Sequence, residues 1–212
     1  MKKIILTSAI VLFTSVYIYS QGSGEDFRSE LQFGLKAGGN YSNVYNERGE
    51  EFVADPKLGL ALGTFLSIPI GTFIGIQPEV LLSQKGFSAS GVILGSPYNF
   101  TRTTTYIDIP VLFSLKPAEF LSIFAGPQYS FLIKQKDVFG VAQSSIEQEL
   151  EFKNENIRKN ILGITGGIDV NITNIVIAAR AGWDVQKNNG DGTSTTPNYK
   201  NVWYQLMVGY RF

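Results

Sequence analysis

The sequence predicts an all-β fold, namely an eight-stranded antiparallel up-and-down transmembrane β-barrel that follows an N-terminal signal peptide. Long segments alternate apolar and polar side chains with a period of two, as strands do when their two faces meet different environments. These segments exceed the roughly five or six residues of an average soluble strand and suit a tilted transmembrane strand. Short and long connections alternate between them, which is typical of outer-membrane barrels.

The chain begins with a segment that is typical of a secretory signal peptide. Two lysines precede the uncharged run Ile4–Ser20, and the small polar residues QGSG follow it. We expect residues 1–20 to be cleaved, residues 21–30 to form a short periplasmic segment and residues 31–212 to form the barrel. The alternative is an uncleaved inner-membrane anchor, because this run has the minimum length that a spanning helix needs.

Composition excludes several classes of site. The chain has no cysteine, which excludes a disulfide scaffold and thiolate chemistry, and no histidine, which removes the commonest general base and zinc ligand. The net charge is zero, so there is no electrostatic reason to expect nucleic acid as a partner. We therefore expect no enzymatic activity, no cofactor and no metal site.

Eight segments are expected as strands because each alternates over its whole length. In the fourth, YIDIPVLFSLK, aliphatic and aromatic side chains share one face while Asp108, Ser114 and Lys116 share the other. The sixth, seventh and eighth segments show the same division. In order, the expected strands are Leu31–Val44, Lys57–Pro69, Phe73–Phe87, Thr103–Lys116, Phe120–Lys136, Ile161–Asn171, Ile175–Gln186 and Lys200–Phe212.

The connections divide into two kinds. Short turns are expected at Ile70–Thr72, Pro117–Glu119 and Thr173–Asn174. Long polar loops are expected at Tyr45–Pro56, Ser88–Arg102, Asp137–Asn160 and Lys187–Tyr199. The loop 137–160 allows two interpretations, a short helix or an extension of the two strands that it joins. Short turns at one rim and long loops at the other predict periplasmic and extracellular ends, respectively.

The direction of the apolar face decides between two barrels. A secreted, soluble lipocalin-like barrel would turn this face inward and bind a small hydrophobic ligand. We favour the opposite arrangement, because the more polar face carries charges that lipid would penalise and a narrow lumen can pair. The charged residues expected inside are Lys36, Glu79, Asp108, Lys134, Asp169, Arg180, Asp184 and Arg211.

Aromatic side chains on the apolar face lie near its two ends. They are Tyr41, Tyr129, Trp183 and Tyr204 toward the long loops, and Phe113, Tyr210 and Phe212 toward the short turns. Such positions predict the two interfacial girdles of a membrane barrel, with outer-membrane lipid as the surrounding partner.

Several strand motifs resemble a known family. FGLKAGGNYSNV, IQPEVLLSQKGF, YIDIPVLFSL and FAGPQYSFLI resemble the outer-membrane β-barrel domain widespread in Bacteroidetes, which is often labelled PorT-like. The resemblance covers residues 31–212 and implies an integral outer-membrane protein of a Gram-negative bacterium, with a link to type IX secretion. Tyr210 and Phe212 are similar to the signal that such proteins present to the barrel-assembly machinery, which implies that machinery as a partner.

Two features are candidates for function. Lys36, Glu79, Asp108, Asp169, Arg180, Asp184 and Arg211 are expected to form an ion network that fills the lumen in a structural role. A narrow ion-conducting barrel is the alternative interpretation of the same charges. The long loops 45–56 and 137–160 carry many acidic residues and are the expected surface for a protein partner.

Overall fold

The computed structural model of the protein describes residues 26–45, 54–93, 96–141, 144–150, 158–188 and 199–212. The predicted signal peptide, residues 1–20, and the first half of the segment 21–30, residues 21–25, lie outside these ranges. Strands dominate the described residues, among which no helix is both long and apolar enough to cross a membrane.

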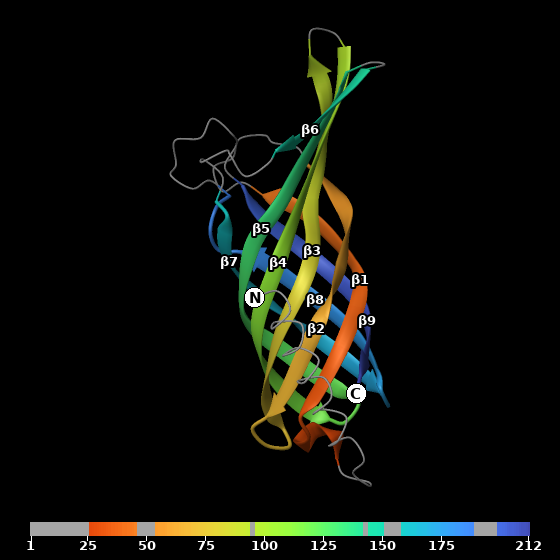
Figure 1. Ribbon diagram of the computed structural model, residues 1–212, viewed down its shortest axis with the longest axis vertical. Coiled ribbons are helices and arrows are strands. Elements are labelled where there is room, and N and C mark those ends of the chain that lie inside the picture. Colours follow the sequence, from red (N-terminus) through yellow and green to blue (C-terminus); the bar gives the residue numbers. More distant parts are fainter. Residues whose placement is uncertain (1–25, 46–53, 94–95, 142–143, 151–157, 189–198) are drawn as a thin grey trace, which may run out of the picture.

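The strands form one antiparallel sheet that closes on itself (Figure 1). Following the hydrogen-bonded order, β4, β3, β2, β1, β9, β8, β7 and β5 are neighbours, and β4 pairs with β5 to close an eight-stranded barrel. The predicted fold is thereby confirmed. The elements are η1 (Phe27–Ser29), β1 (Gln32–Tyr45), β2 (Asp55–Pro69), β3 (Ile74–Ile93), β4 (Ser96–Ala118), β5 (Leu121–Val141), β6 (Ser144–Leu150), β7 (Asn160–Ile172), β8 (Ile175–Asp184) and β9 (Lys200–Arg211).

The short turns and η1 occupy the same end of the barrel (Figure 1). The β7–β8 turn is the predicted two-residue turn, with Ile172 opposite Ile175. Its first residue, Thr173, has a φ of 52°, which is unusual for a β-branched residue. The Arg211 guanidinium stabilises this turn, since its Nε and Nη2 donate to the Thr173 carbonyl oxygen at 2.8 and 2.6 Å.

One predicted loop is a strand hairpin instead. Residues 88–102 were expected to be a polar loop, but β3 continues to Ile93 and β4 begins at Ser96, with the two strands paired up to Ile93 and Ser96. Polar composition does not oppose a strand here, because the two arms of the hairpin satisfy each other's backbone groups in water. In the 137–160 segment, β5 extends to Val141 and pairs with β6, so the strand extension is the correct interpretation.

The four strand ends β3, β4, β5 and β6 project beyond the rest of the barrel (Figure 1). We call residues 88–93, 96–102, 135–141 and 144–150 the projecting sheet. Its strands pair in the order β3, β4, β5, β6.

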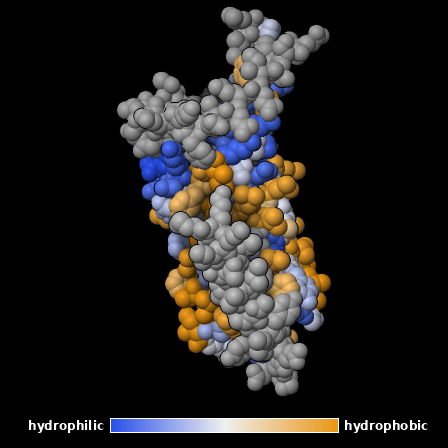
Figure 2. Space-filling view, in the orientation of Figure 1, coloured by the Kyte–Doolittle hydropathy of each residue, from blue (hydrophilic) through white to orange (hydrophobic). Residues whose placement is uncertain are grey.

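The barrel is apolar outside and polar inside. Leu58, Leu60 and Leu62 on β2 are 73%, 69% and 57% exposed, and hydrophobic residues cover much of the visible barrel face in Figure 2. Apolar faces of this extent suit lipid. The arrangement contradicts the lipocalin-like alternative, which requires the apolar face inside. All seven predicted girdle residues are exposed: Tyr41, Phe113, Tyr129, Trp183, Tyr204, Tyr210 and Phe212.

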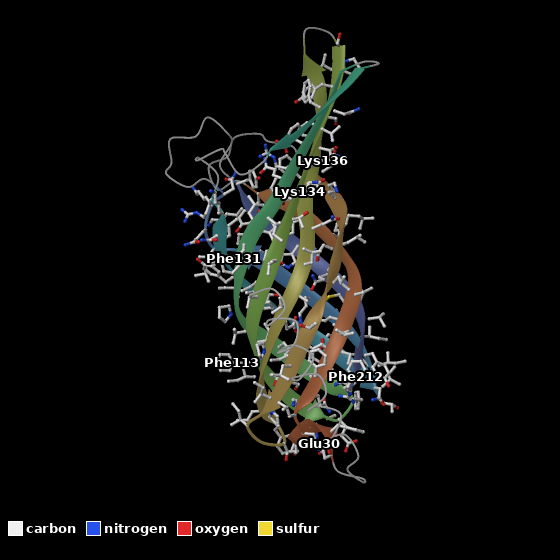
Figure 3. The ribbon with its side chains drawn as sticks, in the orientation of Figure 1. Glu30, Phe113, Phe131, Lys134, Lys136 and Phe212 are labelled. Atoms are coloured by element: carbon white, nitrogen blue, oxygen red, sulfur yellow. The ribbon has the colours of Figure 1, made fainter. Side chains whose placement is uncertain are left out.

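Lys134 does not point into the lumen, so this prediction was wrong. Thr105 pairs with Lys134 but the next residue, Tyr106, pairs with Leu132, so β5 contains one extra residue. Such a bulge reverses which side chains face inward. Ser130 is buried before the bulge and Gln135 after it, whereas Lys134 is exposed near the upper end of β5 (Figure 3).

Candidate functional site

The middle of the lumen contains a charge-balanced network from four strands. The Glu79 carboxylate on β3 lies 2.5 Å from Lys36 Nζ on β1 and 3.6 Å from Arg180 Nη2 on β8. Arg180 also forms an ion pair with Asp169 on β7, and Gln77 Nε2 donates to Glu79 Oε1 at 2.9 Å. Two cations thus meet two carboxylates in a site that is closed to solvent.

Aromatic rings complete the environment of these two cations. Lys36 Nζ lies 5.5 Å from the ring centroid of Phe65, and the Arg180 guanidinium carbon lies 4.5 Å from that of Phe124. Both distances are within the range of cation–π attraction. These groups meet because successive side chains of a strand point alternately inward and outward, and each of these residues occupies an inward position.

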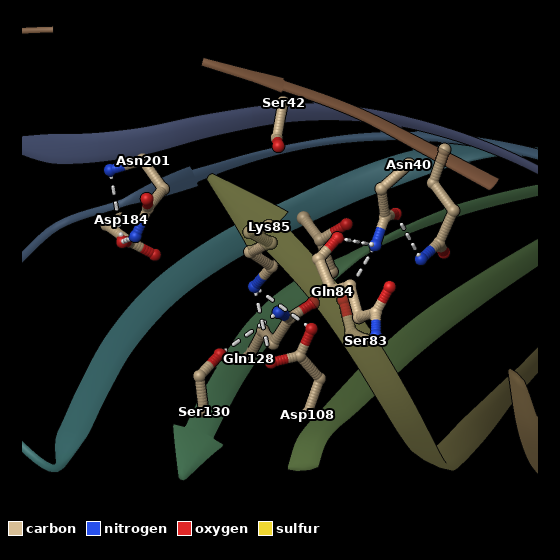
Figure 4. Close-up of polar contacts among 12 residues, drawn as sticks. Asn40, Ser42, Ser83, Gln84, Lys85, Asp108, Gln128, Ser130, Asp184 and Asn201 are labelled. Carbon is tan, nitrogen blue, oxygen red and sulfur yellow. Dashed lines mark hydrogen bonds and ion pairs between the residues drawn. The ribbon is translucent and has the colours of Figure 1, made fainter. Parts of the chain in front are cut away.

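A second network lies nearer the extracellular end (Figure 4). Lys85 Nζ lies 3.0 and 3.2 Å from the two carboxylate oxygens of Asp108, and 3.8 Å from the ring centroid of Trp203. The Asp184 carboxylate accepts hydrogen bonds from Asn201, at 3.1 Å from the backbone nitrogen and 2.5 Å from Nδ2.

Neutral amides link the strands beside these charges. Asn40 Nδ2 donates to Ser83 Oγ at 2.8 Å, and Gln205 Nε2 donates to Asn40 Oδ1 at 2.8 Å. These bonds join β9, β1 and β3 along the inner wall of the barrel (Figure 4). Buried polar groups with complete partners make a lumen rigid.

Side chains also close the extracellular mouth. Arg102 donates two hydrogen bonds to Asp137, at 2.8 and 2.7 Å, and its Nη1 lies 3.4 Å from the Tyr199 hydroxyl. Phe87 packs edge-on against Tyr199 at 5.5 Å between ring centroids and against Phe100 at 5.9 Å. The lumen is therefore filled at this end too.

The periplasmic end is covered by η1. Gln32 Nε2 donates to the Phe27 carbonyl oxygen at 2.9 Å, and Lys116 Nζ donates to the Arg28 carbonyl oxygen at 3.1 Å. Asp26 caps η1 by accepting from the Arg28 backbone nitrogen at 3.0 Å. The hydrogen bonds from the Arg28 side chain, followed by this backbone bond, hold the pKa of Asp26 below its usual value. A cavity of about 20 Å³ lies between η1 and the lumen.

The predicted site residues separate into several groups. Lys36, Glu79, Asp169 and Arg180 meet in the central network. Asp108 and Asp184 lie in the upper network, and Arg211 lies at the periplasmic end beside the β7–β8 turn. All seven residues of the predicted ion network are buried.

Three further buried cations were missing from the predicted network. Lys85 lies an even number of residues from Glu79 on β3, and Lys116 lies an even number from Asp108 on β4, so each points to the same side of its strand as that carboxylate. Counting along the strands would therefore have found both lysines. Arg102 fell within a predicted loop, where no phase could be assigned.

No group of three or more potential metal ligands occurs among the residues that the structure describes. The lumen charges are instead arranged as cation–carboxylate contacts between different strands. Chemically, such contacts can hold a barrel together and can bind ions, but the aromatic and charged layers leave little space inside.

The projecting sheet has two edges of different character. The pairing of β2 with β3 ends at Asp55 and Ser88, so residues 89–93 of β3 pair with β4 and have no second partner strand among the described residues. This edge reads ASGVI and contains neither charge nor proline. At the opposite edge, β6 contains Glu147 and Glu149. Charged residues are a usual protection of edge strands, which the β3 edge lacks.

Several solved structures are similar to this chain at low sequence identity. Similar solved structures include the attachment invasion locus protein Ail of Yersinia pestis, at 14% identity and a TM-score of 0.48, with 86% of this chain and 99% of that chain covered. Neisserial surface protein A is 10% identical with a TM-score of 0.47, over 85% of this chain and 97% of that one. A major outer membrane protein of Thermus thermophilus is 13% identical with a TM-score of 0.48, over 86% and 100%.

No curated protein matches the sequence. A family model does match, over residues 19–186, and its description is outer membrane protein beta-barrel domain. This match includes β1 to β8 and thus most of the closed barrel with its apolar exterior. The chain therefore belongs to the outer membrane protein beta-barrel domain family and is a protein of the outer membrane.

Proposed function

We propose that this protein is a non-enzymatic outer-membrane barrel that presents its projecting sheet to a protein partner outside the cell. The observation that carries the proposal is the β3 edge, residues 89–93, which has no second partner strand among the described residues and lies beyond the rest of the barrel in a sheet of four paired strands. An extended segment of a partner can add to such an edge through backbone hydrogen bonds, with side-chain contacts providing specificity.

The filled lumen supports an interaction role over the ion-conducting alternative. Charged and aromatic side chains occupy the middle and the extracellular mouth, and η1 covers the periplasmic end. In this proposal the ion network is structural, because it holds strands together instead of lining an open path. The loops 45–56 and 137–160 remain proposed surfaces for a protein partner; β6 belongs to the second of them, whereas residues 46–53, 142–143 and 151–157 lie outside the described ranges.

The PorT-like resemblance implies a more specific role in type IX secretion. The motifs that carry this resemblance lie mainly in the strands of the barrel wall, so they describe its construction and identify no partner. We therefore propose the recognition role at the level of the projecting sheet, with a secretion component as one class of partner.

Site-specific photo-crosslinking in intact cells tests the proposal. A photoreactive residue at Val92, which is 69% exposed on the β3 edge, should form discrete adducts with another protein. The same residue at Ile177, which is exposed on the lipid face of β8, is the control and should not form those adducts. Equal adduct patterns at both positions, or none at Val92, would contradict recognition through this edge.

A further inference from the structure

We infer that the periplasmic end of the barrel contains a binding site for an oxyanion group, a carboxylate or a phosphate, formed by Lys116 and Arg211. The inference starts from a difference among the buried cations. Four of them, Lys36, Lys85, Arg102 and Arg180, each have a carboxylate oxygen within 4.0 Å. Lys116 and Arg211 are 4% and 8% exposed, and within the described part of the chain neither has such a partner.

The contacts of these two cations are all with neutral acceptors. Lys116 Nζ donates to the Arg28 carbonyl oxygen at 3.1 Å and to Ser67 Oγ at 3.2 Å. Arg211 donates to the Thr173 carbonyl oxygen and, through Nη1, to Gln32 Oε1 at 3.3 Å. Within the described part of the chain these bonds satisfy donors but give neither cation a carboxylate contact within 4.0 Å. A buried charge without an opposite charge is costly, so the arrangement favours an added anion.

Both cations line the cavity of about 20 Å³ between η1 and the lumen, and Arg28 lines it as well. Two carboxylates also border the cavity, but Asp169 pairs with Arg180 and Glu119 is exposed to solvent. Asp26, the nearest acid in sequence, is held by Arg28. The charges of Lys116 and Arg211 therefore remain available to a ligand.

The size of the cavity restricts what can bind. A water molecule needs about 10–15 Å³ of such volume, so the cavity has room for one or two oxygen atoms. One or two oxygen atoms of a carboxylate or a phosphate can enter it, whereas a sugar ring or a nucleobase cannot. A guanidinium next to an ammonium is a combination that suits oxyanions, because the fork supplies directed hydrogen bonds and the ammonium a concentrated charge.

A stability measurement with defined anions tests the site. The protein in zwitterionic phospholipid vesicles is unfolded in urea while sodium phosphate or sodium acetate is titrated at constant ionic strength with sodium chloride. We expect a saturable rise in the urea midpoint with the oxyanions. Lys116→Gln should weaken apparent phosphate affinity about ten- to hundredfold, because a hydrogen bond to a charged group contributes about 1.5–3 kcal/mol. Lys116→Arg should retain most of the affinity, and Asp55→Asn, an exposed change at the other end of the barrel, should leave it unaltered.

A second arm distinguishes the sources of the oxyanion. Vesicles that contain phosphatidylglycerol, without free phosphate, should raise the midpoint in wild type but not in Lys116→Gln if a lipid headgroup is the ligand. A response to free phosphate or acetate alone identifies a soluble anion. The inference is overturned if neither arm exceeds the chloride baseline, or if Lys116→Gln and Arg211→Gln respond as wild type does. If a glutamine variant fails to fold, competition between phosphate and acetate on the wild-type protein decides, since one site requires mutually exclusive binding.

Discussion

Removal of the Glu79 charge should destabilise the barrel strongly. Glu79 is the carboxylate that joins Lys36 to Arg180 in the central network, at 2.5 and 3.6 Å. In Glu79→Gln the side-chain volume is retained, but Lys36 loses its carboxylate partner while 2% exposed. Breaking a buried pair in this way typically costs about 3–5 kcal/mol, so we expect a loss of that size in the free energy of unfolding.

The partner substitution should cost less, because the network is asymmetric. In Lys36→Met, Glu79 retains Arg180 and the Gln77 hydrogen bond at 2.9 Å. The double variant Lys36→Met/Glu79→Gln removes both charges and leaves the Arg180–Asp169 pair balanced. Its stability should return to within about 1 kcal/mol of wild type, because neutral replacement of a buried pair is often energetically neutral.

Equilibrium unfolding in urea, in phospholipid vesicles, measures these differences through the fluorescence of Trp183 and Trp203. The unboiled protein on a denaturing gel reports independently whether each variant still forms a closed barrel. Asp55→Asn, an exposed substitution, is the control and should change stability by no more than about 0.5 kcal/mol. The reasoning is refuted if Glu79→Gln costs less than about 1 kcal/mol, or if the double variant is as unstable as this single one.

Three further predictions use the same fold. Gly38→Ala would place a Cβ 2.0 Å from the Leu206 carbonyl oxygen, so β1 and β9 must separate, at a cost of about 1–3 kcal/mol in the free energy of unfolding measured in urea. Gly39→Ala is the control, because the nearest atom to its added Cβ is 3.5 Å away, and this substitution should be tolerated. Equal losses of stability in the two variants would contradict this reasoning. Leu206→Arg on the outward face should cost about 2–4 kcal/mol in vesicles, and a neutral effect would argue against lipid contact there. Because Arg28 lowers the pKa of Asp26, the η1 contact should be fully present above pH 3.8, the usual Asp value, and lost as the pH falls through the lower folded value. The protection factor of the Arg28 amide against hydrogen exchange should fall there, and a protection factor that does not change with pH would contradict this.

The faces of the strands were predictable because alternation needs no knowledge of distant contacts. Lys36 and Asp169 are buried and Tyr204 is exposed, as their phases indicate. Lys134 shows where this reasoning stops, because a single inserted residue on β5 reversed the phase after Ser130. The sequence around the bulge, FLIKQKD, contains no glycine or other local signal of it. The bulge is decided by pairing with β4, which is a property of two strands together.

The ion pairs were harder to predict than the faces. The diagonal of Asp169 and Arg180 follows from one hairpin with a two-residue turn, so local register was sufficient. Lys36 and Glu79 lie on β1 and β3, which flank β2, so their contact depends on two successive strand registers. Arg180 on β8 reaches Glu79 on β3 from the opposite wall of the barrel, and this contact depends on barrel closure and strand stagger, which alternation alone does not determine.

The distribution of compensated charge indicates where this barrel can interact. Every buried cation in the middle and at the extracellular mouth, within the described ranges, has a carboxylate partner, so any ligand there would have to displace an existing ion pair. At the periplasmic end Lys116 and Arg211 have only neutral hydrogen-bond partners among the described residues. At the opposite end of the barrel, residues 89–93 pair with β4 but have no second partner strand among the described residues. A ligand that binds a charge or a backbone edge without a partner does not have to displace an existing ion pair or strand. Binding should therefore occur at the two ends of the barrel, with the filled lumen serving to hold both ends in place.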